Sequence, residues 1–90
     1  MKGPKKNLKL LLESTIQCKI IRKMTTEGWL VVKIIQTNRN GWPDLQCHKN
    51  GKTLFIECKS KKGKLSKLQQ YIHQILKQQG FEVLVLDNIP

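Results

Sequence analysis

The chain has 90 residues, of which 39% are hydrophobic, so it is long enough for one small folded domain. That length lies near the lower limit at which a single core is stable without disulfides, a metal or a second subunit, and it favours a dimer. The 17 Lys and Arg residues outnumber the 6 Asp and Glu residues and give a formal net charge of +11, which favours polyanionic partners. Together, the apolar content and the charge exclude a disordered basic tail.

The three cysteines, Cys18, Cys47 and Cys58, lack paired spacing, which fits a reducing compartment better than a disulfide framework. We interpret them as buried apolar thiols, because no C-x-x-C pair indicates a zinc site. The apolar runs are far shorter than the roughly 20 residues of a membrane-spanning helix. The basic start is not followed by a signal-peptide apolar region, and we therefore expect a cytoplasmic protein.

The first half of the chain predicts a helix and a strand. Residues 7–26 carry apolar side chains at spacings of three and four, which is typical of an amphipathic helix ending before Gly28. Residues 29–35 are short and rich in β-branched side chains, and we expect a buried strand there. The apolar positions of the helix are Leu8, Leu11, Leu12, Ile16, Ile20 and Met24.

The middle of the chain predicts a β-hairpin. Residues 44–48 and 53–59 are two strand-like runs around Asn50-Gly51, and both central residues of a type I′ turn need positive φ. Ser66 then begins a second helix, with apolar side chains at positions 68, 72, 75 and 76, and Gly80 ends it. Residues 81–86 form a last strand. The expected order is αβββαβ in a single domain over residues 1–90.

The predicted hairpin brings two carboxylates together. If Asn50 and Gly51 are the loop residues, the register places Asp44 opposite Glu57. Like charges on directly opposed residues are destabilising, and a divalent cation would neutralise them. Because side chains alternate along a strand, Phe55, Glu57 and Lys59 share one face, while the other face is wholly apolar.

The first helix supplies a third acid. At about 100° per residue, Glu13 projects within the apolar arc of the helix, where a carboxylate is costly unless it is paired or bound to a metal. We therefore expect three acids and Lys59 to converge on one side of the sheet, as a site for a hard cation that acts on phosphate. The alternatives are an exposed ion pair on a surface hairpin and a solvated Glu13 at the edge of the stripe.

These residues together resemble a known family. Glu13, the stretch Gly41-Trp42-Pro43-Asp44, the stretch Ile56-Glu57-Cys58-Lys59 and the stretch Ser66-Lys67-Leu68-Gln69 are similar to the VRR-NUC branch of the PD-(D/E)XK nucleases, in its small stand-alone form from phages and bacteria. The resemblance implies the restriction-endonuclease-like αβββαβ core, an α/β fold with a mixed four-stranded sheet flanked by helices. It also implies metal-dependent hydrolysis of DNA by a homodimer that acts on branched, Holliday-junction-like DNA, in a bacterial or phage-infected cell.

The resemblance also assigns roles to residues. Asp44 and Glu57 would bind Mg²⁺ or Mn²⁺ with the main-chain carbonyl of Cys58, and Glu13 would be a further acid of the metal site. Lys59 would orient the attacking water and offset charge on phosphorus, with a glutamine of the second helix near the phosphate or water. That glutamine is Gln69, and the basic residues expected to clamp the DNA backbone are Lys61, Lys62, Lys64 and Lys67.

Several observations leave other interpretations open. The family often has a small aliphatic residue before Pro-Asp, whereas Trp42 is large and packs against either a partner subunit or a DNA base. His48 and His73 have no acid or nucleophile at an informative spacing, and we expect them at the surface. Gln69 and the lysines are alternatively plain polar surface. A non-catalytic DNA-binding module is the main rival function, and a zinc or RNA-binding domain is less well supported.

Overall fold

The computed structural model describes residues 8–90, and the side chains of residues 13–90. Its elements follow the predicted order αβββαβ, and the expected α/β fold with a mixed four-stranded sheet flanked by helices is confirmed. The elements are α1 (Leu8–Thr26), β1 (Leu30–Lys33), β2 (Leu45–Lys49), β3 (Lys52–Cys58), α2 (Lys67–Gln78) and β4 (Glu82–Leu86).

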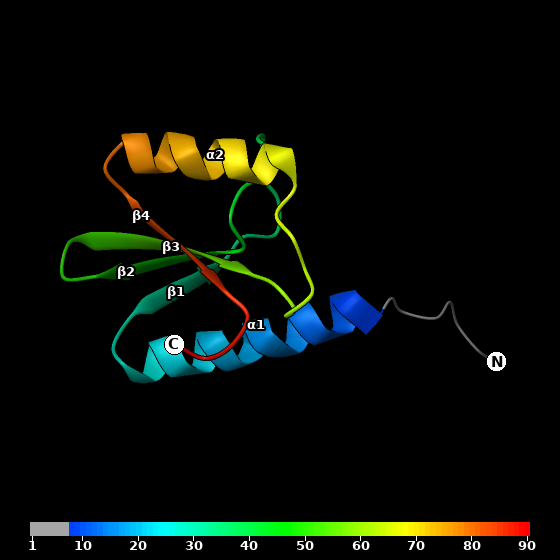
Figure 1. Cartoon of the computed structure of the whole chain (residues 1–90). Helices are drawn as coiled ribbons and strands as arrows, with labels where there is room; N and C mark the ends of the chain where they lie inside the picture. Colours follow the sequence, from blue (N-terminus) through cyan, green and yellow to red (C-terminus); the bar gives the residue numbers. More distant parts are fainter. Residues whose placement is uncertain (1–7) are drawn as a thin grey trace.

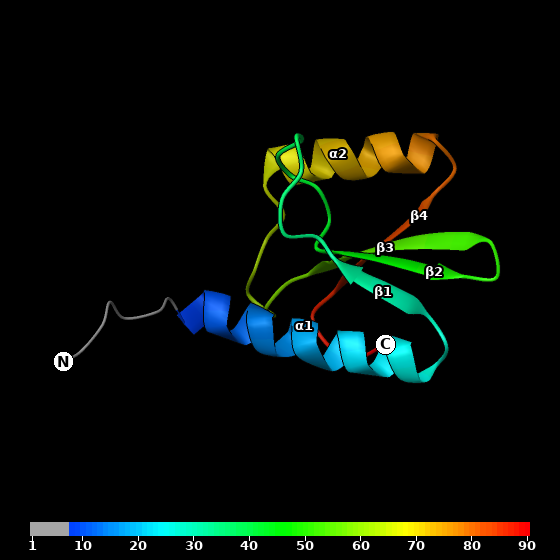
Figure 2. The same ribbon diagram turned by 180° about the vertical axis from the view of Figure 1, so that it is seen from behind.

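The strands form one mixed sheet between the two helices. The strand order is β1-β2-β3-β4, with antiparallel pairing from β1 to β3 and parallel pairing of β3 with β4. A parallel pair needs a crossover connection, and α2 provides it. The two opposite views show α1 beneath the sheet and α2 above it (Figures 1 and 2).

Each helix packs on its own apolar cluster, because alternate residues of β3 point to opposite faces. On the α1 face, Leu54, Ile56 and Cys58 are buried with residues of α1 and β2. On the α2 face, Phe55 is buried with Val83 of β4 and with residues of α2. The helix residues that complete the clusters are Ile20 and Met24 of α1, and Ile72 and Leu76 of α2. The predicted separation of the two faces is confirmed, although Phe55 adds an apolar cluster to the α2 face.

The hairpin turn is the predicted one. Asn50 and Gly51 have φ of 50° and 78°, and Lys49 pairs with Lys52. From this pair the register runs to Leu45 opposite Ile56, as predicted. The turn therefore determines which residues of β3 face each helix.

The predicted strand within residues 29–35 is present, but the prediction that it is buried is wrong. Strand β1 is shorter, and within residues 8–90 it lies at an edge of the sheet and pairs only with β2. Leu30 is 66% exposed, Val32 is 41% exposed, and Ile35 lies beyond the strand at 81%. A β-branched run has the same composition in an edge strand and in a central strand, so the local sequence did not distinguish them.

The ends of α2 are as predicted. The Ser66 hydroxyl accepts a hydrogen bond from the main-chain N–H of Gln69, and the Gln69 side chain accepts one from the main-chain N–H of Ser66, which forms a capping box. Gly80 follows the helix with φ of 93°, a conformation that glycine adopts without strain.

Two further expectations concern side chains of α1. Cys18 is exposed, so the prediction of three buried thiols is wrong for this residue and right for Cys47 and Cys58. The predicted apolar side chains at positions 8, 11 and 12 lie outside the described side chains. In residues 8–90, no helix is both long and apolar enough to span a membrane.

Candidate active site

Asp44 is held at the end of the sheet by main-chain contacts on both sides. Its carbonyl oxygen accepts a hydrogen bond from the N–H of Ile34 at 2.8 Å, and its Oδ2 accepts one from the N–H of Cys58 at 2.8 Å. The preceding Pro43 is fully buried. Asp44 therefore lies beside the end of β3, one residue beyond the last ladder pair of β2 with β3.

Glu57 is a buried carboxyl beside Asp44, with 2% of its surface exposed. The pKa of Glu57 is raised to about 9, mainly by burial and then by the hydrogen bond and the charge of the neighbouring Asp44. Glu13 contributes in the same direction, whereas the ammonium group of Lys59 opposes the shift. The structure thus brings together the three acids and the lysine that the sequence singled out.

The Cys58 side chain takes no part in this polar group. It points to the α1 face, and burial, followed by the charges of Asp44 and Glu57, raises the pKa of the thiol to about 12. A thiol of this kind is protonated and unreactive at neutral pH. Any contribution of Cys58 to a metal site comes from its main chain.

Glu13 approaches the other acids from α1, and this corrects one expectation. We expected all the acids on one side of the sheet, but α1 covers the face opposite to α2 (Figure 1), and the Glu13 side chain of α1 lies beside the loop that follows β3. Its Oε1 is buried and has no hydrogen-bond partner. A Cβ atom on Gly63 would lie 3.1 Å from this oxygen, so the glycine leaves the space that the carboxylate occupies.

His73 is a site residue that the sequence reasoning missed. The prediction of a surface histidine is wrong, because His73 is 4% exposed and its Nε2 lies 3.1 Å from Oε1 of Glu57. Burial lowers the pKa of His73, and the nearby Lys77 acts in the same direction, so the contact is a hydrogen bond of a neutral ring. The signal was present in the sequence: His73 lies between Ile72 and Leu76, inside the apolar arc of α2, as Glu13 does in α1.

The other predicted residues surround the acids. Lys59 is half-buried directly after β3, and its main-chain N–H donates to the carbonyl of Leu86 at 2.9 Å. Gln69 is half-buried, and its Oε1 is used by the capping box at the start of α2. The exposed lysines before and at the start of α2 are Lys61, Lys62, Lys64 and Lys67.

Trp42 is half-buried, and part of its ring packs within the chain. Its ring makes an edge-to-face contact with Phe55 at 5.6 Å between ring centroids. Trp42 therefore extends the apolar cluster on the α2 face, next to Pro43 and Asp44.

The side chains at this site suit a hard divalent cation. Carboxylate oxygens are the ligands that Mg²⁺ and Mn²⁺ prefer, and Asp44 and Glu57 provide them side by side, with Glu13 as a further acid nearby. The unpartnered Oε1 of Glu13 is an acceptor that a ligand would satisfy. Across residues 8–90, no group of three or more His, Cys, Asp and Glu side chains forms a metal site by itself. A divalent cation could still be held by two carboxylates together with a main-chain carbonyl oxygen, and Asp44, Glu57 and the carbonyl of Cys58 fit such a ligand set.

Comparisons with known proteins identify the family. The chain matches the VRR-NUC domain family over residues 3–88. This chain belongs to the VRR-NUC domain family. A similar protein is the "Putative nuclease p44" of Acyrthosiphon pisum secondary endosymbiont phage 1, which is 32% identical over 82 residues covering 90% of this chain and 88% of that protein. A solved structure of a VRR_NUC domain superposes with a TM-score of 0.77 and 26% identity, over 86% of this chain and 85% of that one. Together, these similarities support a nuclease.

Proposed function

We propose that this VRR-NUC domain is a Mg²⁺- or Mn²⁺-dependent endonuclease that hydrolyses DNA phosphodiester bonds. The observation that carries the proposal is the burial of Glu57 beside Asp44, where the pKa of Glu57 rises to about 9. Clustered buried carboxyls cost stability and repel phosphate, so a protein that only binds DNA gains nothing from them. Family membership and the nuclease name of the phage relative point to the same chemistry.

In the proposed site, Asp44, Glu57 and the main-chain carbonyl of Cys58 hold the cation, and Glu13 contributes as a further acid. When bound, a divalent cation polarises a phosphate oxygen and lowers the pKa of a coordinated water. The ammonium group of Lys59, a half-buried residue, orients the attacking water and offsets the negative charge that develops on the phosphate oxygens. Because the capping box uses Oε1 of Gln69, the amide nitrogen is the part of that side chain that contacts phosphate or water.

The DNA backbone is bound by the exposed lysines of the segment before α2. That segment follows Lys59 directly and begins next to Glu13, so phosphates adjacent to the scissile bond lie within its reach. With a formal net charge of +11, the chain attracts DNA over a long range. We further propose that the domain acts as a homodimer on branched, Holliday-junction-like DNA, since two copies supply the paired cuts that such a substrate requires.

The test is cleavage of a supercoiled plasmid and of a four-way junction in Mg²⁺, Mn²⁺ or EDTA. Wild-type protein is expected to cut only with metal, and Asp44→Ala and Lys59→Ala are each expected to reduce cutting about 100-fold or more. Both variants should still bind the junction in a gel shift, more tightly for Asp44→Ala because a negative charge is removed. Unchanged cutting by both variants rules out the assigned site. A wild-type protein that binds but never cuts is instead the non-catalytic module, and sedimentation tests the dimer.

A further inference from the structure

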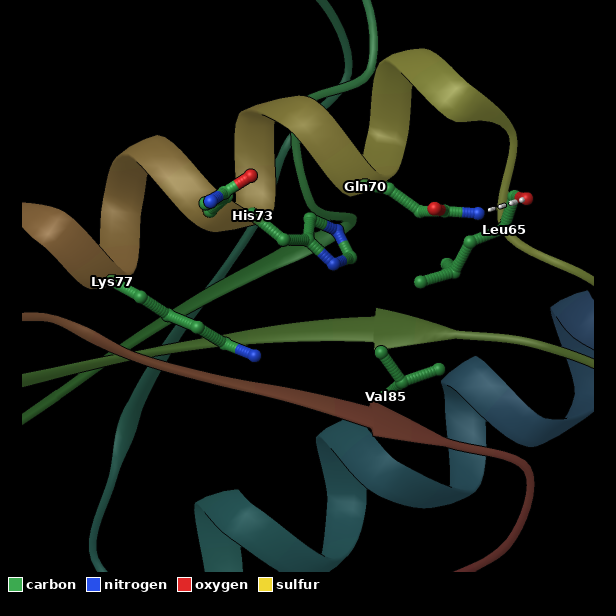
Figure 3. Close-up of a pocket in the computed structure, with 6 residues that line it drawn as sticks. Leu65, Gln70, His73, Lys77 and Val85 are labelled. Atoms are coloured by element: carbon green, nitrogen blue, oxygen red, sulfur yellow. Dashed lines mark hydrogen bonds between the residues drawn. The ribbon is translucent and has the colours of Figure 1, made fainter.

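His73 lies behind the proposed active site rather than in it. It projects from α2 toward the sheet, between the helix and β4 (Figure 3). The His73 and Glu57 side chains are 5% and 2% exposed, and the 3.1 Å contact between them is the hydrogen bond that His73 makes within the described part of the chain. A buried imidazole on the apolar face of a helix costs stability that a leucine would not, unless a hydrogen bond replaces the water contacts that the imidazole has lost.

The contact fixes one oxygen of Glu57. In the ionised, metal-binding form of Glu57 both carboxylate oxygens accept, so in that form Nε2 of His73 donates the hydrogen and Oε1 of Glu57 is held toward α2. On its other side, Glu57 meets Asp44, whose position is set by the N–H of Cys58. The Glu57 carboxyl therefore has polar neighbours on two sides. Asp44 lies on one side, next to the start of β2, and His73 of α2 lies on the other.

We propose that His73 is a positioning residue that holds the Glu57 carboxylate in the orientation required for metal binding. This inference rests on the proposed function and adds a residue to it. Groups that hydrogen-bond to metal ligands fix ligand geometry, and their loss typically costs about 10- to 100-fold in metal affinity or activity. His73 touches neither the substrate nor the reacting atoms.

A cavity beside His73 offers a route by which a small molecule such as imidazole can reach the position of the His73 ring. His73 forms part of its wall, between α2 and β4, and its volume of about 230 Å³ is larger than a free imidazole. Removing the side chain of His73 extends this cavity toward Glu57. The other residues around it are Leu65, Gln70, Gln74, Lys77 and Val85.

The first experiment compares two substitutions. His73→Gln keeps an amide N–H near the position of Nε2, whereas His73→Leu keeps the volume and removes the donor. In a Mn²⁺ titration of the full chain, His73→Leu is expected to bind the metal about 10- to 100-fold more weakly than wild type, with His73→Gln close to wild type. The kcat of junction cleavage should fall by a similar factor for His73→Leu alone, with KM and DNA affinity unchanged.

The second experiment uses chemical rescue. His73→Ala is expected to lose cleavage as His73→Leu does, and added imidazole should raise its rate about tenfold by restoring the hydrogen bond through the cavity. The matched control is His48→Ala, because His48 is half-buried on β2 and contacts Gln46 and Thr53 rather than an acid. Imidazole should change neither the control nor the wild type.

The outcomes separate this inference from the proposed function. Wild-type metal affinity and cleavage in a folded His73→Leu overturn the role of His73 and leave the nuclease assignment intact. Equal losses in His73→Gln and His73→Leu, without imidazole rescue of His73→Ala, also overturn it, because they indicate a packing role. Absence of cleavage by wild type contradicts the proposed function, and the Mn²⁺ titration then decides the role of His73 alone.

Discussion

Oδ2 of Asp44 accepts a hydrogen bond from the main-chain N–H of Cys58 at 2.8 Å, so the first acid of the site is anchored to the residue that follows the second. This bond continues the contact between β2 and β3 beyond their last ladder pair, with a side chain in place of a main-chain carbonyl. Asp44 therefore combines a structural role with a proposed catalytic one, and substitutions separate the two.

Asp44→Asn and Asp44→Ala are expected to differ in stability and to agree in activity. Asparagine keeps an oxygen that accepts from Cys58, whereas alanine leaves that buried N–H without a partner, at a cost of about 1–3 kcal/mol. Both remove the negative charge and should abolish metal-dependent cleavage. Urea unfolding and plasmid nicking measure the two effects, and an active Asp44→Asn variant would show that the charge is not needed.

The stability of the metal-free protein should depend on pH through Glu57. Its pKa is 4.5 in the unfolded chain and about 9 in the folded one, so between these values the folded state holds a proton that the unfolded state has lost. Stability therefore falls as pH rises through this window, by up to about 1.4 kcal/mol per pH unit. Glu57→Gln has no such proton, and in EDTA its stability should exceed that of wild type increasingly with pH. Parallel urea curves for both proteins at every pH would contradict this.

Gly63→Ala should reduce activity by displacing Glu13. The new Cβ would lie 3.1 Å from both Oε1 of Glu13 and the carbonyl oxygen of Ser60, closer than such contacts normally are. Displacement of this kind lowers rates by up to about 100-fold. The control is Gly51→Ala, which meets open space at φ of +78° and costs about 1 kcal/mol without touching the site. If nicking falls equally in both variants, the effect on Glu13 is not specific.

Gln69→Glu separates the capping role of this side chain from its proposed role in catalysis. Glutamate completes a capping box as well as glutamine does, so the melting temperature should stay within a few degrees of wild type. It lacks the amide donor and adds a negative charge near the phosphate, and we expect cleavage to fall at least about tenfold. Wild-type cleavage by this variant would leave Gln69 with the helix cap alone.

The lysines that follow β3 should contribute to DNA affinity through charge alone. Replacing Lys61 and Lys62 by alanine is expected to weaken junction binding and to lower the slope of log affinity against log salt by about 2, because each phosphate that a lysine neutralises contributes about 0.9 to that slope. The control is Lys52→Ala, since Lys52 is also exposed but is the first residue of β3, next to the hairpin turn and at the other end of the strand. Fluorescence anisotropy in Ca²⁺ measures binding without cutting, and equal slopes for the two variants would argue against a specific phosphate clamp.

Much of the fold was predictable because local rules determine it. The Asn50-Gly51 turn fixes the register of the hairpin, and that register by itself predicts that Asp44 and Glu57 lie together. Ser66 and Gly80 mark the ends of α2 in the same way. Each of these signals acts within a few residues, where sequence patterns are most informative.

The remaining features depend on contacts between distant segments. Whether residues 29–35 are buried depends on what lies beside β1, and the side on which Glu13 approaches depends on which face α1 covers. The bond between His73 and Glu57 joins residues 16 positions apart in sequence. Spacing alone does not indicate such a pair, because it forms only when α2 packs over the sheet.

The open edge at β1 has a consequence for handling the protein. No strand of residues 8–90 covers the outer edge of β1, so its main-chain groups there and its exposed Leu30 and Val32 are available for pairing with another chain. At low ionic strength, a net charge of +11 keeps copies apart, but salt near 1 M shortens the range of that repulsion to about 3 Å. Concentrated salt, which is the usual means of stripping nucleic acid from a basic protein, should therefore also promote its precipitation.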